Sequence, residues 1–187
     1  MSPQQVVAEA KKKFNQAKDH LEDDLKKVRT GRAHPTMLDG VMVEAYGTSM
    51  PLIQVGSISA PEAQLLQITP FDINNIEAIS KAIRENHSLG LNPMDDGKVV
   101  RIQIPPLTEE RRKEYTKLVS SKLEDCMVSF RNARHEAMKL IDEAKKDKDI
   151  GEDDAKRLGE QVDEAMSEMK AETEAIAKAK EADIMKV

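Results

Sequence analysis

The sequence predicts an α+β protein in which an elongated three-helix bundle carries a small inserted β/α/β domain. Charge is spread unevenly along the 187 residues: the stretch from Gly31 to Pro105 holds 5 basic and 8 acidic residues, whereas the rest of the chain holds 24 and 26. Six of the eight glycines and six of the eight prolines also lie in that middle stretch, which is typical of turns and short strands. The predicted bundle therefore comprises residues 1–30 and 106–187, and the predicted inserted domain comprises residues 31–105.

Outside the insert, three segments place apolar residues at spacings of three and four, which is the pattern of one face of a helix. The first segment ends near Gly31, the second begins after Pro106 and the third follows Gly151. Three such stripes can bury one another as a bundle. They consist of Val7, Ala10, Phe14, Ala17, Leu21, Leu25 and Val28; of Tyr115, Val119, Leu123, Cys126, Phe130, Ala133, Ala137, Leu140 and Ala144; and of Ala155, Leu158, Val162, Ala165, Met169, Thr173, Ile176 and Ile184.

The insert is predicted to contain strands, turns and one short helix. Strands are expected at residues 41–46, 64–69 and 99–104, where aliphatic and β-branched residues lie between glycines and prolines. A helix is expected after Asn75, which can cap it, and a turn is expected at residues 91–93.

Composition and motifs exclude several classes of protein. No apolar run approaches the ~20 residues of a transmembrane helix, and the first residues lack the apolar core of a secretory signal. The sequence contains no phosphate-binding glycine loop, no dinucleotide fingerprint and no Cys-x-x-Cys or His-Glu-x-x-His motif, and its four histidines are scattered. The lone Cys126 lies on an apolar stripe, which favours a buried thiol in a reducing compartment over a nucleophile. We therefore expect no catalytic residues, no metal, no cofactor and no membrane contact, and a cytoplasmic location.

Arginines gather at three places. Arg131 and Arg134 stand three residues apart beside the second apolar stripe, and no acidic residue occurs from Met127 to His135. Such arginines either pair with acids of neighbouring helices or bind phosphate oxygens in bidentate geometry. Because only 3% of the residues are aromatic, a phosphate site would recognise folded RNA by its shape rather than by stacking on bases. The further members of this candidate RNA-binding set are Arg29, Arg32, Arg111 and Arg112.

The motifs that carry the most information lie at the two ends of the insert. Residues 29–33 read Arg-Thr-Gly-Arg-Ala, and residues 105–113 read Pro-Pro-Leu-Thr-Glu-Glu-Arg-Arg-Lys. Together with Leu-Gly-Leu-Asn-Pro at 89–93, Arg-Asn-Ala-Arg at 131–134 and Ile-Gly-Glu-Asp-Asp at 150–154, they resemble the ribosome recycling factor family, in the same order and over nearly the whole chain.

The resemblance implies an L-shaped molecule of about the size of a transfer RNA. It implies a factor, expected here as a monomer, that binds the post-termination ribosome on its large subunit and splits it into subunits together with elongation factor G and GTP, without hydrolysing anything itself. The principal contacts to ribosomal RNA would be Arg131 and Arg134, with Arg29, Arg32, Arg111 and Arg112 nearer the junction. The connection between bundle and insert would be a hinge made of Arg29, Thr30, Gly31, Arg32, Pro105, Pro106 and Leu107.

Other interpretations stay open at this point. His135 and Met138 depart from the family's pattern, and His135 makes part of the positive charge beside Arg134 depend on pH. A coiled-coil adaptor or chaperone is the alternative function, and it would show large exposed apolar patches and binding that salt does not weaken. A bacterial cytosol and an organelle matrix both fit the sequence.

Overall fold

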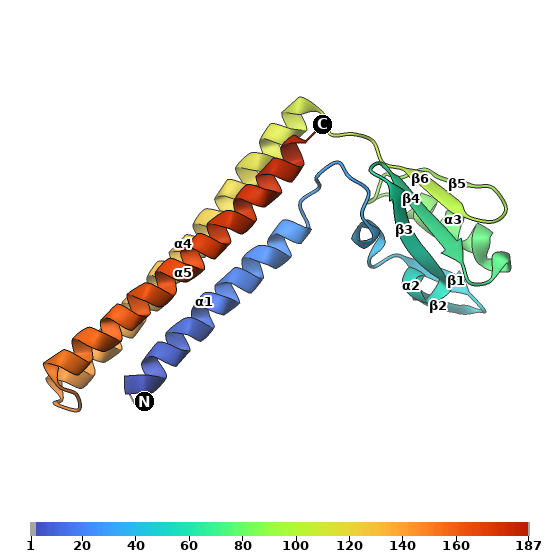
Figure 1. Cartoon of the computed structure of the whole chain (residues 1–187). Helices are drawn as coiled ribbons and strands as arrows, with labels where there is room; N and C mark the ends of the chain where they lie inside the picture. Colours follow the sequence, from blue (N-terminus) through green and yellow to red (C-terminus); the bar gives the residue numbers. More distant parts are fainter. Residues whose placement is uncertain (1–2, 187) are drawn as a thin grey trace. The chain divides into compact units, whose positions relative to one another are not determined.

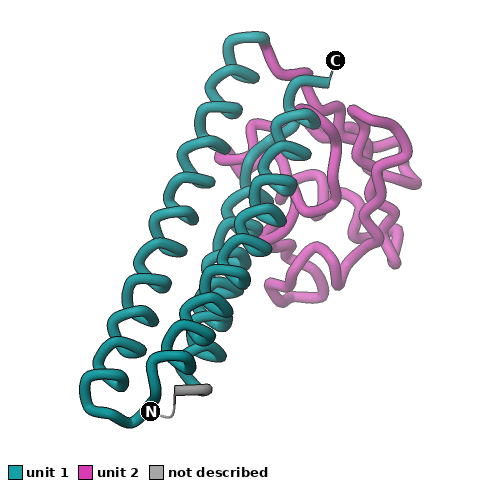
Figure 2. The backbone as a smooth tube through the Cα atoms, turned by 60° about the vertical axis from the view of Figure 1, so that its left-hand side comes forward, with its two compact units in different colours: residues 1–30, 109–187 teal, residues 31–108 magenta. Residues whose placement is uncertain are grey.

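A computed structural model describes residues 3–186 of the chain (Figure 1). These residues belong to two compact units, unit 1 with residues 1–30 and 109–187, and unit 2 with residues 31–108. The chain passes twice between the units, which Figure 2 distinguishes by colour. Unit 1 is helical and unit 2 contains strands, so the α+β class predicted from the sequence is confirmed.

Unit 1 is a bundle of three long helices, α1 (Pro3–Lys26), α4 (Glu109–Lys146) and α5 (Glu152–Met185). Each helix packs against the other two, and in Figure 1 α4 and α5 run side by side over most of their length. The predicted stripes meet in one core. At its centre the rings of Phe14 and Phe130 are fully buried, edge to face, with centroids 5.5 Å apart, which is a favoured arrangement of aromatic rings.

One position of the predicted stripe on α4 is wrong. Leu140 is 36% exposed, whereas Ile141 is 3% exposed and belongs to the core. A step of four from the buried Ala137 completes slightly more than one helical turn, so Ile141 stays on the face that Phe130 and Ala137 share. The step of three to Leu140 leaves that face.

Unit 2 contains two antiparallel sheets and one main helix (Figure 1). The first sheet is the hairpin β1 (Met42–Ala45) and β2 (Thr48–Pro51). The second has the order β3-β4-β6-β5, with β3 (Gly56–Glu62), β4 (Leu65–Pro70), β5 (Pro93–Asp95) and β6 (Val100–Gln103). The helix α3 (Ile76–Glu85) turns Ile76, Ile79 and Ile83 into a separate core of this unit. Short helical turns complete it at Pro35–Leu38, at Leu52–Val55 (α2) and at Ile73–Asn75.

The three strands predicted in the insert are confirmed as β1, β4 and β6, but three others were missed. Strands β2 and β3 are mostly exposed, so they lack the alternation of buried and exposed residues that reveals a strand. The turn predicted at 91–93 gives way at Pro93 to the three-residue β5.

The predicted cap of α3 is also wrong. The side chain of Asn75 makes no capping hydrogen bond, and its buried Nδ2 has no partner in the structure. Asp72 accepts a hydrogen bond from the backbone amide of Asn74 at 3.0 Å instead. A short 3₁₀ turn precedes α3, so the capping carboxylate lies three residues earlier than the apolar pattern indicated.

Candidate nucleic-acid interface

Arg131 and Arg134 lie in the middle of α4, on either side of the buried Ala133. Because Phe130 and Ala133 face the core, the two arginine side chains lie at the edge of the face with which α4 contacts the other helices. The Arg131 side chain is 57% exposed and that of Arg134 is 43% exposed. Both guanidinium groups therefore remain accessible from solvent.

Both arginines are paired with acids within unit 1. Arg131 donates from Nη2 to Oε1 of Glu124, two turns earlier on α4, at 2.6 Å. Arg134 donates from Nε and Nη2 to the two carboxylate oxygens of Asp163 on α5, at 2.5 and 3.2 Å. The hydrogen bond from Arg134 to Asp163 raises the pKa of the Arg134 guanidinium above its already high usual value, so the charge on Arg134 is permanent.

The pairs leave several guanidinium N–H groups outside them. A guanidinium has five N–H donors, and the pair with Asp163 uses the Nε edge of Arg134. The Nη1 group of Arg134 takes no part in that pair, and Arg131 contacts Glu124 through Nη2 alone. A phosphate could thus approach either arginine while its carboxylate partner stays in place.

A groove of about 350 Å³ runs beside Arg131 between α4 and α5. Met127 and Met166 contribute apolar lining, and Lys170 lines it from α5. Lys170 itself pairs with Glu174 at 3.8 Å. Sequence reasoning missed both Lys170 and Asp163 as neighbours of the arginine pair, since both lie on α5 and only the register between the two helices brings them close.

The other predicted arginines have different surroundings. Arg111 pairs with Glu114 at 2.9 Å. Arg112 donates from Nη1 to the carbonyl oxygens of Ile184, at 3.3 Å, and of Lys186, so its guanidinium holds carbonyl groups at the end of α5. Arg29 and Arg32 are both exposed.

The two connecting segments between the units meet at Gly31. Gly31 has φ +77°, a left-handed conformation that only glycine adopts without strain. A Cβ atom at this position would lie 3.2 Å from Cγ of Leu107 and 3.4 Å from its backbone nitrogen. The predicted hinge residues Gly31 and Leu107 are therefore neighbours, and a side chain at position 31 would be strained by the positive φ and would also press on Leu107.

The single cysteine and the side chains that could ligate a metal are the other groups that bear on chemistry. Cys126 is buried, and burial raises its thiol pKa to about 11, so the predicted buried thiol is confirmed. Among residues 3–186, no group of three or more His, Cys, Asp or Glu could hold a metal ion. In the same range, no helix combines the length and the apolar character that crossing a bilayer demands.

A three-helix bundle with an inserted antiparallel-sheet unit defines the structural class, and comparison with known proteins defines the family. The ribosome recycling factor family model matches residues 21–185. The ribosome-recycling factor of Sorangium cellulosum (strain So ce56) is 42% identical over 182 residues, which cover 97% of this chain and 98% of that protein. The ribosome-recycling factor of Corynebacterium glutamicum (strain R) is 39% identical over 183 residues, which cover 98% of both. The chain therefore belongs to the ribosome recycling factor family.

Solved structures agree with this assignment. A solution structure of the ribosome recycling factor is similar with a TM-score of 0.78 and 35% identity, covering 100% of this chain and 99% of that chain. A second neighbour comes from a structure of the T. thermophilus ribosome recycling factor and the E. coli elongation factor G bound to the E. coli post-termination complex. Its factor is similar with a TM-score of 0.66 and 35% identity, over 100% of both chains.

Proposed function

We propose that this chain is a translation factor that binds post-termination ribosomes and, with elongation factor G and GTP, splits them so that ribosome, messenger RNA and transfer RNA are recycled. The observation that carries the proposal is family membership over residues 21–185. A factor of this family that is similar over the whole chain is seen together with elongation factor G on a post-termination complex. The chain acts as a monomer in the compartment of its ribosomes, a bacterial cytosol or an organelle matrix.

Unit 1 binds RNA of the large ribosomal subunit through the exposed face that Arg131 and Arg134 share. Both residues keep guanidinium N–H groups outside their ion pairs, and Lys170 lines the adjoining groove. Guanidinium donors match phosphate oxygens, and the net charge of −5 limits non-specific attachment elsewhere on the surface. Arg29, Arg32 and Arg111 add contacts nearer the junction, and Arg112 contributes there while it holds the end of α5.

The connecting segments act as a hinge made of residues 29–32 and 105–107. The neighbouring Gly31 and Leu107 allow small changes in backbone torsion at one place to reorient one unit. We assign binding and leverage to this chain, and the hydrolysis of GTP to elongation factor G.

Unit 2 exposes several large apolar side chains. Of the large apolar side chains that are exposed, six belong to unit 2, and Tyr46, Ile53, Phe71 and Met94 are each at least 69% exposed. Exposed aromatic and aliphatic side chains of this kind can contact a protein partner. Elongation factor G is such a partner, so this observation fits the recycling role as well as an adaptor.

Light scattering of post-termination ribosomes tests the proposal. Mixing them with this protein, elongation factor G and GTP should lower the scattering as subunits separate, and omission of any one component should abolish the fall. The matched control is a ribosome recycling factor already active on the same ribosomes. If that control works and this protein does not, the recycling role is refuted for those ribosomes, and salt-insensitive binding to proteins would then favour the adaptor.

A further inference from the structure

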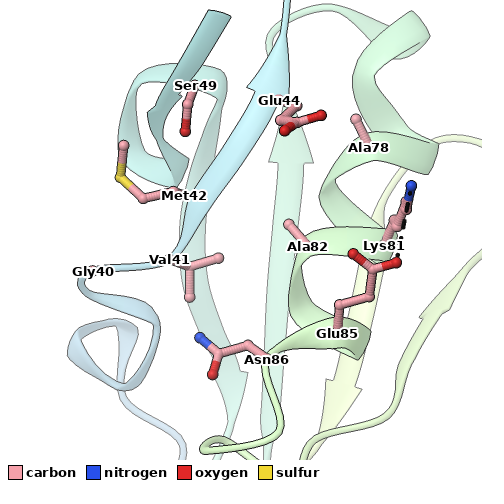
Figure 3. A pocket seen from close by; sticks show the side chains of 10 residues that line it. All are labelled: Gly40, Val41, Met42, Glu44, Ser49, Ala78, Lys81, Ala82, Glu85 and Asn86. Carbon is pink, nitrogen blue, oxygen red and sulfur yellow. Dashed lines mark ion pairs between the residues drawn. The ribbon is translucent and has the colours of Figure 1, made fainter.

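Strand β1 has one free edge, and that edge faces helix α3. The sheet contains only β1 and β2, so β1 has a single strand neighbour. Figure 3 shows the strand from Gly40 to Glu44 with Ser49 of β2 on one side and α3 on the other. Between them lies an open groove of about 690 Å³, within the ~300–1,000 Å³ typical of binding pockets.

The hairpin turn determines which backbone groups point into this groove. Tyr46 and Gly47 have φ +54° and +74°, the signature of a two-residue type I′ turn. In such a hairpin the closing pair, Ala45 with Thr48, exchanges both backbone hydrogen bonds, and bonded pairs then alternate with non-bonded ones. The N–H and C=O groups of Met42 and Glu44 therefore point away from β2, toward the free edge.

Each of the other strands of unit 2 that has a free edge contains a proline. Pro51 ends β2, Pro61 lies in β3 beside a register shift, and Pro93 begins the three-residue β5. Prolines and bulges are two of the devices by which proteins prevent strand addition at exposed edges. β1 reads Met-Val-Glu-Ala and contains neither a proline nor a bulge, so every residue of this strand keeps its backbone N–H group.

The residues that line the groove also favour particular side chains in a bound segment. On the α3 side the small residues Ala78 and Ala82 leave room for an aliphatic side chain. Lys81 pairs with Glu85 at 3.9 Å, whereas Glu44 makes no ion pair with any residue from 3 to 186. An uncompensated carboxylate beside the strand favours a cation across from it and repels phosphate.

We propose that the free edge of β1 receives an extended segment of a partner protein as a third strand, with a lysine or arginine beside Glu44 and an aliphatic side chain against Ala78 and Ala82. Strand addition of this kind takes its affinity from main-chain hydrogen bonds and its selectivity from alternate side chains. A second copy of the chain fits less well, since β1 contains no lysine or arginine that could lie across from Glu44. The proposal does not depend on the recycling role.

Amide hydrogen exchange of the full-length, ¹⁵N-labelled protein tests it, with the probe peptide acetyl-Val-Lys-Val-Lys-Val-amide. At saturation the exchange of the Met42 and Glu44 amides should slow by about tenfold or more. Ser49 is the internal control, because its amide points to the free edge of β2 and should not change. Equal protection of Ser49, or peptide-induced changes confined to other residues, would overturn the proposal.

Reversing the charges of the peptide and of residue 44 provides the second test. The peptide with glutamates in place of its lysines should bind the parent about fivefold more weakly, the scale of one exposed ion pair, and Glu44→Lys should reverse the preference. Glu44→Pro removes one edge N–H and should abolish binding while the hairpin amides of Val43 and Ala45 stay protected. An unchanged preference in Glu44→Lys, or protection of Met42 and Glu44 that rises with protein concentration in the absence of peptide, would overturn the proposal.

Discussion

Replacing Arg134 by alanine should lower the salt dependence of RNA binding by one phosphate contact. If Arg134 neutralises one phosphate, its loss reduces the slope of log K against log salt concentration by about 0.7 to 0.9. Between 50 and 200 mM salt, the parent should therefore lose about threefold more affinity for the large ribosomal subunit than Arg134→Ala loses. The assay is equilibrium binding of the labelled factor to isolated large subunits at four salt concentrations.

The fold should not change in this variant. Arg134 and Asp163 are 43% and 49% exposed, and an exposed ion pair contributes at most about 1 kcal/mol to the free energy of unfolding. Far-ultraviolet circular dichroism should be unaltered. Arg157→Ala is the matched control, because Arg157 also forms an exposed pair, with Asp154 at 2.6 Å, and lies outside the proposed interface. Identical salt slopes for parent and Arg134→Ala would remove Arg134 from the interface.

Three further predictions concern the connection and the core. Gly31→Pro should impair ribosome splitting more than ribosome binding, because proline cannot adopt φ +77°; light scattering and pelleting measure the two activities. Gly90→Pro, also at positive φ but outside the connection, is its control, and equal impairment by both would refute the hinge. Phe130→Ala should lower the free energy of unfolding of unit 1 by about 3–5 kcal/mol, read from urea denaturation, and a loss below about 1 kcal/mol would contradict the central role of the Phe14–Phe130 contact. Cys126, with its thiol pKa near 11, should react with iodoacetamide at pH 8 at least about a hundredfold more slowly in the native than in the unfolded chain; comparable rates would contradict its burial.

The sequence predicted the elements that bury a regular stripe and failed where burial is irregular. The long helices and strands β1, β4 and β6 each turn a periodic set of apolar residues to a core, and periodicity is what sequence analysis detects. Strand β3 buries only its first residue fully, so its pairing with β4 is determined by backbone hydrogen bonds that no side-chain pattern records.

In the candidate interface, too, the sequence predicted some residues and missed others. The spacing of apolar residues predicts that Arg131 and Arg134 lie at the edge of the buried face of α4, because the helical repeat fixes the positions next to buried residues. Their partners could not be predicted in the same way. Asp163 is 29 residues from Arg134 along the chain, and it meets Arg134 only because the turn between α4 and α5 sets the register of the two helices. Met138 faces Gly159, with sulfur 3.5 Å from where a Cβ would lie, in that same register.

The pairing with Asp163 leads to a prediction of its own. If phosphate binds the Nη1 group of Arg134 while Asp163 keeps the Nε edge, the carboxylate stays about 7 Å from the phosphate and repels it by about 0.6 kcal/mol in water. Asp163→Asn should then tighten binding to large subunits about threefold at low salt, and the gain should shrink as salt screens the repulsion. Glu164→Gln, the neighbouring acid on α5 whose charge has no pair with either arginine, should change affinity less.

The opposite result would be equally informative about the geometry. Weaker binding by Asp163→Asn, with an unchanged salt slope, would mean that the carboxylate holds the guanidinium in the orientation that phosphate requires, and that ordering Arg134 outweighs the repulsion. In that case Asp163→Glu should restore part of the affinity, because a carboxylate one methylene longer can still accept from Nε and Nη2. The sign of the change therefore decides whether Asp163 competes with RNA for Arg134 or presents Arg134 to it.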